Sequence, residues 1–496
     1  MRFSRASLAR GTLWNFLGQG APLVVAIFAI PPLVQALGTE RFGVLVLVWM
    51  FIGYFSLFDL GIGRALTQLL SERLAVADEQ HVSGLVWTAM LLMLALGIAG
   101  AGLLLLAAPV MVHSLLRIPA AFQLEALRAL QVLALAIPAV VMTAGLTGVL
   151  AAKQRFDAIN ILRLPMGLYT YLAPWLVVQF SPDLFLISVA LATGRAIFLI
   201  LHVVACMRVA PGLRRPRIDA GAIKPLFRFG TWMTVSNIIG PLMVYVDRFV
   251  IGMLISMSAV AFYATPYEVV TRLWIVPAAI VAVLFPAFAS LHDRDRRHVA
   301  ELFDRGLRYM VVLMFPLALV IVAFARQGLQ LWLGEEFAER STDVLRWLAV
   351  GVFVNSLCQV AFALVQGAGR PDLSAKFHLL QLPLYLGLLW LLLRSHGIEG
   401  AAVAWTVRIL LDAVMLFMAA RVIIPECRWV VARFWPYASV ATGVLCALAM
   451  LDNPILATGG FIGVLAFFCV TGWRSLMADD ERAWLLGKVN GIFHRR

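Results

Sequence analysis

Nine charged residues lie inside long apolar segments of this chain. A charge at mid-membrane depth costs about 2.5–3.5 kcal/mol on insertion scales, so such residues need a partner, water or a function. An arginine presents a planar fork of donors that suits an anion, and phosphate above all. We take the five arginines as candidate anion-binding groups and the four acids as candidate coupling or charge-balancing groups. They are Arg64, Arg195, Arg248, Arg272 and Arg408, with Asp59, Asp247, Glu268 and Asp412.

Arg195 and Arg408 occupy matching positions in two similar stretches, Thr193-x-Arg195 and Thr406-x-Arg408. Asp412 follows Arg408 by one helical turn and can pair with it, whereas Arg195 has no acid within a turn. An unpaired guanidinium at this depth favours an anionic ligand. The alternative is an arginine bonded to backbone carbonyls between packed helices, and the sequence leaves both interpretations open.

Two further pairs allow a functional and a structural interpretation. Glu268 and Arg272 are one turn apart, so they are either a cavity-lining pair whose acid takes up a proton or structural glue between helices. Asp247 and Arg248 are adjacent and point about 100° apart on a helix, so we do not expect a self-contained pair. Snorkelling or bonds to other helices are the alternatives there.

The stretch from Asp59 to Arg64 combines both charges with two glycines, Gly61 and Gly63. A spacing of five residues places the two side chains roughly 140° apart on an ideal helix, so they do not pair unless the glycine region bends. We expect this stretch to form a charged wall and entrance of a transport pathway. The alternative for Arg64 is that it snorkels to the nearer membrane surface.

The elements that hold these charges are predicted to be membrane-spanning helices. The chain has 496 residues, of which 62% are hydrophobic and 14% charged. A soluble protein is about 25% charged, and a helix crosses a bilayer with about 20 apolar residues. The apolar runs predict an all-α polytopic membrane protein with about 14 helices, at 12–36, 42–70, 84–110, 123–151, 159–180, 184–207, 226–254, 259–291, 303–325, 343–367, 374–394, 398–421, 434–451 and 455–473.

The Lys and Arg residues predict the orientation of these helices. Of the 40, 28 lie on the side that holds the N-terminus, 7 lie on the other side, and 5 lie inside spans. Positive charge accumulates on the cytoplasmic side, so both termini are expected in the cytoplasm. The net charge of +13 is thereby explained without nucleic acid. We expect the first apolar segment to be retained as a span, because it is long and contains three prolines.

An internal repeat links the first six predicted helices to the next six. Matching features recur at offsets of 213–219, among them Arg155-Phe-Asp157 with Arg370-Pro-Asp372. A repeat of six helices keeps its orientation, which predicts two six-helix lobes related by a pseudo-two-fold along the membrane normal. The predicted organisation is an N-lobe at 1–209, a basic cytoplasmic linker at 210–224, a C-lobe at 225–424, two accessory helices at 425–474 and a cytoplasmic tail at 475–496.

Signals for catalysis and cofactors are poor. The chain has no GxxxxGK[ST], HExxH or GxSxG motif, and its five cysteines are scattered without ligand-like spacing. The sequence His292-Asp293-Arg294-Asp295 contains Asp-x-Asp but is surrounded by basic residues, so we interpret it as a cytoplasmic loop. We expect no enzyme activity, no metal and no cofactor.

Six stretches together resemble the Wzx-type oligosaccharide flippases of the multidrug/oligosaccharidyl-lipid/polysaccharide exporter superfamily. The resemblance covers about residues 10–424. Its stretches are Leu37-Gly38-Thr39-Glu40-Arg41-Phe42-Gly43, Phe58-Asp59-Leu60-Gly61-Ile62-Gly63-Arg64-Ala65, Asp247-Arg248-Phe249-Val250-Ile251-Gly252, Tyr263-Ala264-Thr265-Pro266-Tyr267-Glu268, Leu331-Trp332-Leu333-Gly334 and Gln366-Gly367-Ala368-Gly369-Arg370-Pro371-Asp372.

The resemblance implies twelve core helices around a central cavity, with two accessory helices. It implies movement of an undecaprenyl-diphosphate-linked oligosaccharide from the cytoplasmic to the periplasmic leaflet of a bacterial inner membrane, for O-antigen or other surface polysaccharide assembly. Alternating access coupled to an H⁺ or Na⁺ gradient is the mechanism expected of the family. Membrane lipid and polysaccharide polymerase machinery are the further partners it implies. The site arginines come from the sequence and not from the resemblance.

Three other functions remain open on the sequence. A lipid II flippase differs chiefly in its substrate. A cation-coupled multidrug antiporter of the same superfamily is expected to carry cavity acids without so many arginines. A membrane polysaccharide polymerase or ligase is expected to have a large outer loop, and the longest outer segment here, about 326–342, is short.

Overall fold

The computed structural model describes residues 5–55, 59–75, 79–451 and 453–471, with side chains outside 5–19, 75, 79–81, 227–242, 454–455 and 471. Within these ranges the chain is helical and has no β-strand. The predicted tail at 475–496 and the first four residues lie outside the described part. The chain divides into two compact units, residues 1–261 and 262–496, and each is described by itself.

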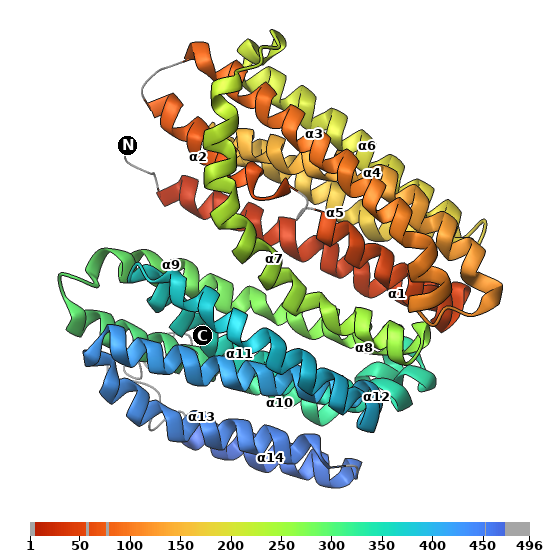
Figure 1. Cartoon of the computed structure of the whole chain (residues 1–496). Helices are drawn as coiled ribbons and strands as arrows, with labels where there is room; N and C mark the ends of the chain where they lie inside the picture. Colours follow the sequence, from red (N-terminus) through yellow and green to blue (C-terminus); the bar gives the residue numbers. More distant parts are fainter. Residues whose placement is uncertain (1–4, 56–58, 76–78, 452, 472–496) are drawn as a thin grey trace, which may run out of the picture. The chain divides into compact units, whose positions relative to one another are not determined.

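The first unit contains seven helices (Figure 1). α1 packs along α5, α3 along α4, and α4 along α6. α7 packs against α1, α2 and α3. The bounds are α1 Arg5–Tyr54, α2 Ile62–Ala75, α3 Glu79–Val110, α4 Ala120–Ala152, α5 Phe156–Val178, α6 Leu184–Val209 and α7 Ile223–Leu254, with a π-helical turn at Met111–Leu115.

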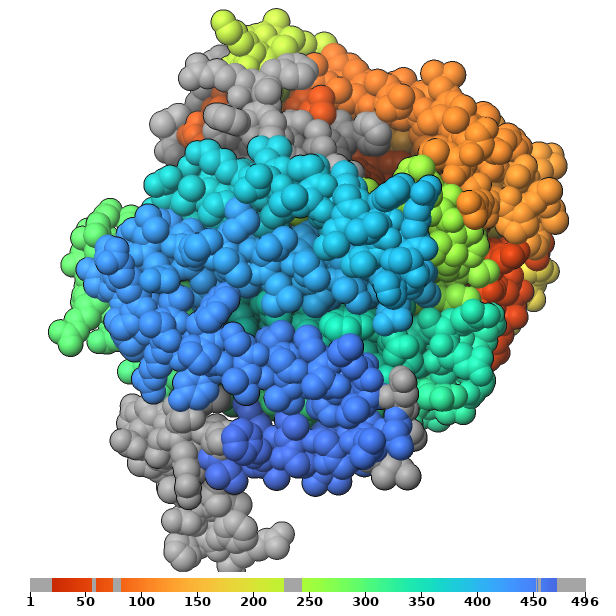
Figure 2. Space-filling model, turned by 60° about the horizontal axis from the view of Figure 1, so that its bottom comes forward, coloured from red at the N-terminus to blue at the C-terminus, as the bar shows by residue number. Residues whose placement is uncertain are grey.

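The second unit begins inside α8 and is built around α11. α10, α12 and α9 pack against α11, and α13 and α14 pack on α10. Figure 2 shows α13 and α14 in dark blue on the surface of this unit. The bounds are α8 Met257–Thr271, α9 Ile275–Leu291, α10 Arg296–Leu333, α11 Glu335–Gly367, α12 Pro371–Ile423, α13 Arg428–Ala449 and α14 Pro454–Thr471, with short 3₁₀ turns η5 at Arg272–Trp274 and η6 at Pro425–Cys427.

The helix ends agree with the predicted spans once two breaks are recognised. α1 changes direction at Gly38, with φ of 71°, and α12 does so at Gly397, with φ of 59°. Glycine adopts these angles without steric cost. α12 therefore contains both predicted spans 374–394 and 398–421, whereas α1 contains the predicted span 12–36 and only the first part of 42–70. The prediction of one continuous helix at 42–70 is wrong, because the chain turns at Leu60 and Gly61, with φ of 48° and 75°, and continues as α2. Conversely, the prolines of the predicted helix 259–291 divide it into α8, η5 and α9.

Ten described helical segments are long and apolar enough to cross a membrane. α12 holds two predicted spans, α1 holds one and part of a second that continues in α2, and α7 and α14 correspond to two further predicted spans. Large apolar side chains face outward on these helices, as at Leu106 (80% exposed) and Val422 (77% exposed). Contiguous exposed apolar surface of this extent suits lipid rather than water. The chain is therefore an all-α multi-pass membrane protein.

The predicted linker is docked against α3. Its two 3₁₀ turns, η3 (Pro211–Arg214) and η4 (Ala220–Ala222), lie at one end of this helix. The Trp87 indole N–H donates to the carbonyl of Leu213 over 2.9 Å, and the Thr88 hydroxyl accepts from the backbone N–H of Asp219 over 2.8 Å. The linker segment 211–222 thus belongs to the fold of the first unit.

The same helix stop occurs at the two positions related by the repeat. The backbone N–H groups of Lys153, Gln154 and Arg155 bond to the carbonyls of Val149, Ala151 and Leu150. Those of Ala368, Gly369 and Arg370 bond to Leu364, Gln366 and Val365, each 215 residues later. Gln154 and Gly369 both have positive φ, of 58° and 74°. The repeat therefore has a structural counterpart here, which we call the duplicated helix stop.

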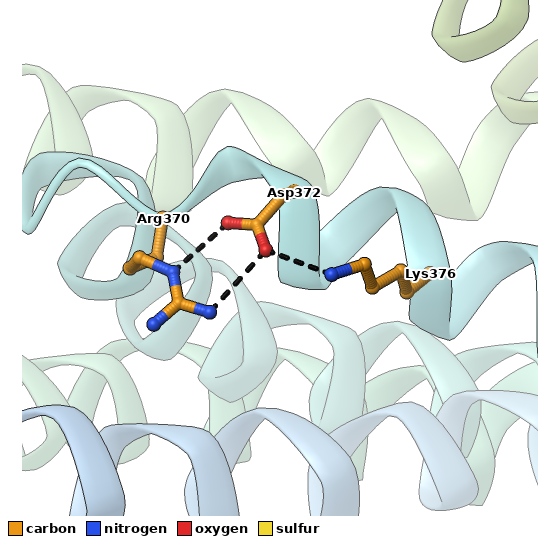
Figure 3. Close-up of polar contacts among 3 residues, drawn as sticks. All are labelled: Arg370, Asp372 and Lys376. Carbon is orange, nitrogen blue, oxygen red and sulfur yellow. Dashed lines mark hydrogen bonds and ion pairs between the residues drawn. The ribbon is translucent and has the colours of Figure 1, made fainter.

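A two-pronged ion pair follows each stop. Arg155 donates from Nε and Nη2 to the Asp157 carboxylate over 2.9 Å each. Arg370 donates in the same way to Asp372 over 3.0 and 3.3 Å, and Lys376 adds a third bond of 3.1 Å (Figure 3). The acid lies in the first turn of its helix in both cases, where negative charge is favourable.

Candidate functional site

Asp59 caps the start of α2. Its carboxylate accepts the backbone N–H groups of Gly61 over 2.8 Å and Gly63 over 3.3 Å, and the side chain is buried. The chain turns here through Leu60 and Gly61, with φ of 48° and 75°. Arg64 points out of α2 and is exposed. The bend that the glycines suggested is present, but it gives Asp59 backbone partners and no ion pair with Arg64 among the described residues.

Asp247 and Arg248 belong to a buried cluster between α7 and the end of α1. The Arg248 guanidinium lies 3.9 Å from the Asp247 carboxylate, donates to the carbonyl of Val244 over 3.0 Å, and stacks 5.0 Å from the ring of Tyr245. Tyr245 in turn packs on Tyr54, with ring centroids 5.1 Å apart. Contrary to the expectation from helix angles, the two neighbours do pair, because the long arginine side chain folds back along its own helix.

Arg195 is half-buried near the middle of α6. It lies on the helix face of Leu191 and Phe198, which are buried against α4 and α5. Within the described part of the chain, no residue forms a hydrogen bond or ion pair with its guanidinium. Ser188, two turns earlier on this face, is buried, and its hydroxyl also lacks a partner there. The role of Arg195 as an anion-binding group stays a prediction, and its lack of a partner among the described residues agrees with it.

Arg408 and Asp412 lie in the part of α12 that follows the break at Gly397. This part packs back on the part before the break, and both charges are buried. The Arg408 guanidinium lies 5.5 Å from the ring of Tyr385 and 6.0 Å from that of Trp405. Asp412 accepts a hydrogen bond of 2.9 Å from the side-chain amide of Gln381.

The ion pair expected between Arg408 and Asp412 does not form in the described structure. Tyr385 and Gln381, from the part of α12 before the break, contact Arg408 and Asp412 respectively, and Trp405 lies one turn before Arg408. A cation over an aromatic face is stabilised by about 0.5–2 kcal/mol, and a carboxylate gains a charge-assisted bond from an amide. Sequence spacing within one helix could not reveal partners that only the hairpin at Gly397 brings near.

Glu268 and Arg272 form the i,i+4 pair that their spacing predicted. The Arg272 Nη2 and Glu268 Oε2 atoms are 3.1 Å apart, and both side chains are over one-third exposed. Arg272 begins the 3₁₀ turn η5, where the helix register changes. Tyr267, which directly precedes Glu268, packs on Tyr263 and on Trp405, with ring centroids 6.3 and 5.6 Å apart.

The candidate residues thus fall into separate groups. Asp59, Arg64, Arg195, Asp247 and Arg248 belong to the first unit, and Glu268, Arg272, Arg408 and Asp412 to the second. The common cavity expected for Arg195 and Arg408 stays a prediction. Within the described ranges, no group of histidines, cysteines and acids could hold a metal ion.

Sequence reasoning missed the polar partners on the first part of α12. They are Ser374, His378, Gln381 and Tyr385, at spacings of four, three and four residues. This spacing places them on one helix face. The signal was present in the sequence as polar residues at helical period within an otherwise apolar run.

Comparison with known proteins places this geometry in context. The family model described as "Polysaccharide biosynthesis protein" matches residues 33–342. The "Putative O-antigen transporter" of Shigella flexneri is 29% identical over 413 residues, which are 83% of this chain and 97% of that protein. The "Probable low-salt glycan biosynthesis flippase Agl15" of Haloferax volcanii is 22% identical and covers 53% of this chain and 57% of its own length.

Two solved structures show the fold. An inward-facing multidrug resistance MATE family transporter of the MOP superfamily superimposes with a TM-score of 0.68 at 15% identity, covering 84% of this chain and 95% of its own. The lipid II flippase MurJ in an inward closed conformation gives a TM-score of 0.67 at 12% identity, covering 95% of this chain and all of its own.

Proposed function

Because this chain belongs to the polysaccharide biosynthesis protein family and has the fold of MOP-superfamily transporters, we propose that it flips an undecaprenyl-diphosphate-linked oligosaccharide across a bacterial inner membrane. The direction is from the cytoplasmic to the periplasmic leaflet, in support of O-antigen or other surface polysaccharide assembly. The Shigella relative is named as a transporter of O-antigen, which supports this substrate class.

The half-buried, unpartnered guanidinium of Arg195 is the observation that carries the proposal. The polar headgroup of such a lipid consists of sugars on a diphosphate, while its polyprenyl tail stays in the bilayer. A diphosphate in the membrane interior requires cationic hydrogen-bond donors, and arginine supplies them in a two-pronged geometry. Arg195 is half-buried on a helix face, and no residue in the described part of the chain accepts a hydrogen bond from its guanidinium.

Arg408 is the second proposed contact for the anionic headgroup. Its guanidinium lies over aromatic rings and does not pair with a carboxylate. Its Nε atom is buried without a hydrogen-bond partner in the described chain. It is therefore available to an anion at a modest cost. Arg64, which is exposed at the start of α2, is proposed to receive the headgroup at the entrance, with Arg248 and Arg272 as weaker contacts because acids already accompany them.

The proposed mechanism is alternating access driven by an ion gradient. A ligand shifts a conformational equilibrium only by binding the two states with different affinity, so the cationic site must weaken on the outer side. The acids Asp247, Glu268 and Asp412 are candidates for balancing the arginines after release. Asp59 is the weakest of the four candidates, because two backbone N–H groups already occupy its carboxylate.

The relatives and folds found are those of transporters, so the chain is a transport protein and not a glycan-bond-forming enzyme. The similarity to a MATE transporter keeps drug export as the second candidate function. The two differ in the group recognised: a drug cation is repelled by free arginines, whereas a diphosphate is attracted to them.

Reconstituted protein tests the proposal. Proteoliposomes containing a fluorescent undecaprenyl-diphosphate oligosaccharide report leaflet transfer through loss of access to a membrane-impermeant quencher. We expect Arg195→Gln to slow transfer by about tenfold or more, since one charge-assisted bond contributes about 1.5–3 kcal/mol. Arg195→Lys keeps the positive charge but loses the two-pronged donor geometry. Its transfer rate should lie between those of the wild type and Arg195→Gln.

Arg155→Gln is the matched control, because Arg155 is an exposed arginine that already pairs with Asp157. It should transfer at the wild-type rate. Equal rates for wild type and Arg195→Gln would refute the role of Arg195. Export of a cationic dye without glycolipid transfer would favour the antiporter, and a new glycosidic bond in the product would favour an enzyme.

A further inference from the structure

One buried face of α12 carries polar side chains from the beginning of the helix to its centre. Ser374, Gln381 and Tyr385 are at most 5% exposed, and His378 between them is half-buried. Side chains three and four residues apart are neighbours on a helix surface, with Cβ atoms about 5–6 Å apart. These four residues therefore form a continuous row, which we call the α12 polar row.

The α12 polar row ends on Asp412 and Arg408, which project from the returning part of the same helix. Gln381 donates to the Asp412 carboxylate over 2.9 Å, and Tyr385 lies under the Arg408 guanidinium. His378 is one turn before Gln381 and close enough to both charges to interact with them electrostatically. From α11, Cys358 also lies close to both. The other elements packed on this part of α12 contribute Glu426 in η6 and Arg428 at the start of α13.

Several buried polar atoms along this row have no protein partner. They are Oγ of Ser374, Oε1 of Gln381 and Nε of Arg408, each without a hydrogen bond in the described chain. Buried polar groups are almost always satisfied, and ordered water supplies the partner where protein does not. The spacing of these atoms along the helix marks a line of positions that water can bridge.

Asp412 differs from the other three intramembrane acids in its surroundings. Asp59 accepts two backbone N–H groups, Asp247 lies against Arg248, and Glu268 is paired with Arg272. Among the residues that the structure describes, the neutral side-chain amide of Gln381 is the one hydrogen-bond donor to Asp412. Burying a carboxylate with a single neutral donor is costly, and the α12 polar row leads from this carboxylate toward the beginning of the helix.

We propose that Asp412 is the proton-binding group of this transporter and that the α12 polar row connects it to the end of α12 at Pro371. The proton passes from water to the imidazole of His378 and then to the Asp412 carboxylate, which becomes a carboxylic acid while the imidazole returns to its neutral form. Ser374 holds bridging water at the entrance. The exposed cluster of Arg370, Asp372 and Lys376 lies beside that entrance (Figure 3).

The proton-binding group also controls Arg408. When Asp412 is neutral, a negative charge near the Arg408 guanidinium is gone, so an anion binds there more tightly. Coupling between two ligands is reciprocal, and an anion at Arg408 must change proton affinity at Asp412 by the same factor. The inference rests on the proposed function for this link to the cargo, but the proton site itself does not.

The first unit lacks the equivalent acid. The offset of 213 that relates Arg408 to Arg195 places Leu199 at the position of Asp412. The polar row is likewise not repeated, since the offset of 215 between the two helix stops places Ile159 and Arg163 opposite Ser374 and His378. The proton site therefore belongs to the second unit alone.

Infrared spectroscopy on the full-length protein in lipid nanodiscs tests the proton site without any glycolipid. A pH titration should reveal a carboxylic-acid C=O band above about 1,700 cm⁻¹ that Asp412→Asn abolishes; the asparagine oxygen keeps the bond from Gln381, so the fold is retained. Asp412→Glu should shift the band without removing it. This variant tests the proposal if Asp412→Asn does not fold.

Asp304→Asn is the matched control. Asp304 is also 7% exposed and also lies in the second unit, but it is paired with Arg308 at 2.9 Å. Its band pattern should match wild type. Persistence of the titrating band in Asp412→Asn would overturn the proposal, as would its loss in the control.

The His378 relay and the link to transport have separate outcomes. After a pH jump, His378→Gln should slow the appearance of the Asp412 band by about tenfold or more; an unchanged rate would remove His378 from the path. In proteoliposomes, Asp412→Asn should lose the pH dependence of glycolipid transfer. If the band titrates on Asp412 but wild-type transfer ignores pH, the proton site stands and the proposed ion coupling fails.

Discussion

At the scale of single residues, a charged side chain in an apolar segment can have several functions. Its hydrogen-bond and ion-pair partners indicate which of them applies. The sequence singled out Asp59 because it lies in a glycine-containing stretch at membrane depth. In the structure, its carboxylate accepts hydrogen bonds from two backbone N–H groups at the start of α2, where the helix itself supplies no acceptor. Its burial is explained by this cap alone.

Substitution of Asp59 separates capping from coupling. Asp59→Asn and Asp59→Ser keep an oxygen that accepts the N–H groups, so both should fold and transfer glycolipid at near wild-type rates. Asp59→Ala should lose about 0.5–2 kcal/mol of stability, seen as a lower apparent unfolding temperature in detergent. If Asp59→Asn lost transport but kept its stability, the result would show that Asp59 takes part in ion coupling as well as in capping.

Pairs within one helix turn were only partly predictable. The Glu268–Arg272 pair follows from i,i+4 spacing and forms at 3.1 Å. The same spacing gave a wrong prediction for Arg408 and Asp412, which contact Tyr385 and Gln381 from the other side of the hairpin in α12. Residue spacing predicts which partners lie within a helical turn. It does not predict contacts with side chains that are distant in the sequence.

At the scale of elements, the sequence predicted helix ends well because long apolar runs and basic termini mark them directly. What it did not reveal is where backbones come into contact. The α1 segment after Gly38 lies so close to the α7–α8 connection that a Cβ on Gly43 would overlap the carbonyl oxygen of Met257, the first residue of α8. Thr39 and Ser258 hydrogen-bond beside it over 3.2 Å.

Gly43→Ala should therefore be poorly tolerated. Backbone cannot rotate away as a side chain can, so the extra methyl group must separate α1 from the connection at a cost of about 1–3 kcal/mol. We expect a lower apparent unfolding temperature and a lower yield of monodisperse protein. Gly102→Ala in α3 is the control, since nothing lies within 4 Å of its added Cβ. Equal stability of the two variants would show that this contact is loose.

At the scale of the whole molecule, composition and charge were sufficient for the class of protein. The all-α membrane fold and the membership of the polysaccharide biosynthesis protein family are confirmed. Internal contacts divide the chain at Ala261 inside α8, and the predicted lobes, which meet at the linker 210–224, stay a prediction. Packing of α7 against α1, α2 and α3 depends on contacts between distant segments, which hydropathy does not record.

The orientation in the membrane is a prediction for intact cells. In a variant whose five cysteines are replaced, Ser395→Cys precedes the turn in α12 and Asp293→Cys lies in the basic loop after α9, and both positions are exposed. A membrane-impermeant maleimide should label position 395 in spheroplasts and position 293 only after permeabilisation. The reverse pattern would place the termini outside and invert the proposed direction of transport.

The duplicated helix stop has a consequence for ancestry. Two copies of one hydrogen-bond pattern, 215 residues apart, are what a tandem gene fusion would leave where the ends of helices tolerate little change. An ancestor assembled from two identical subunits would have carried an acid at both interior positions or at neither. Leu199 and Asp412 now differ, so the two halves specialised after the gene was duplicated.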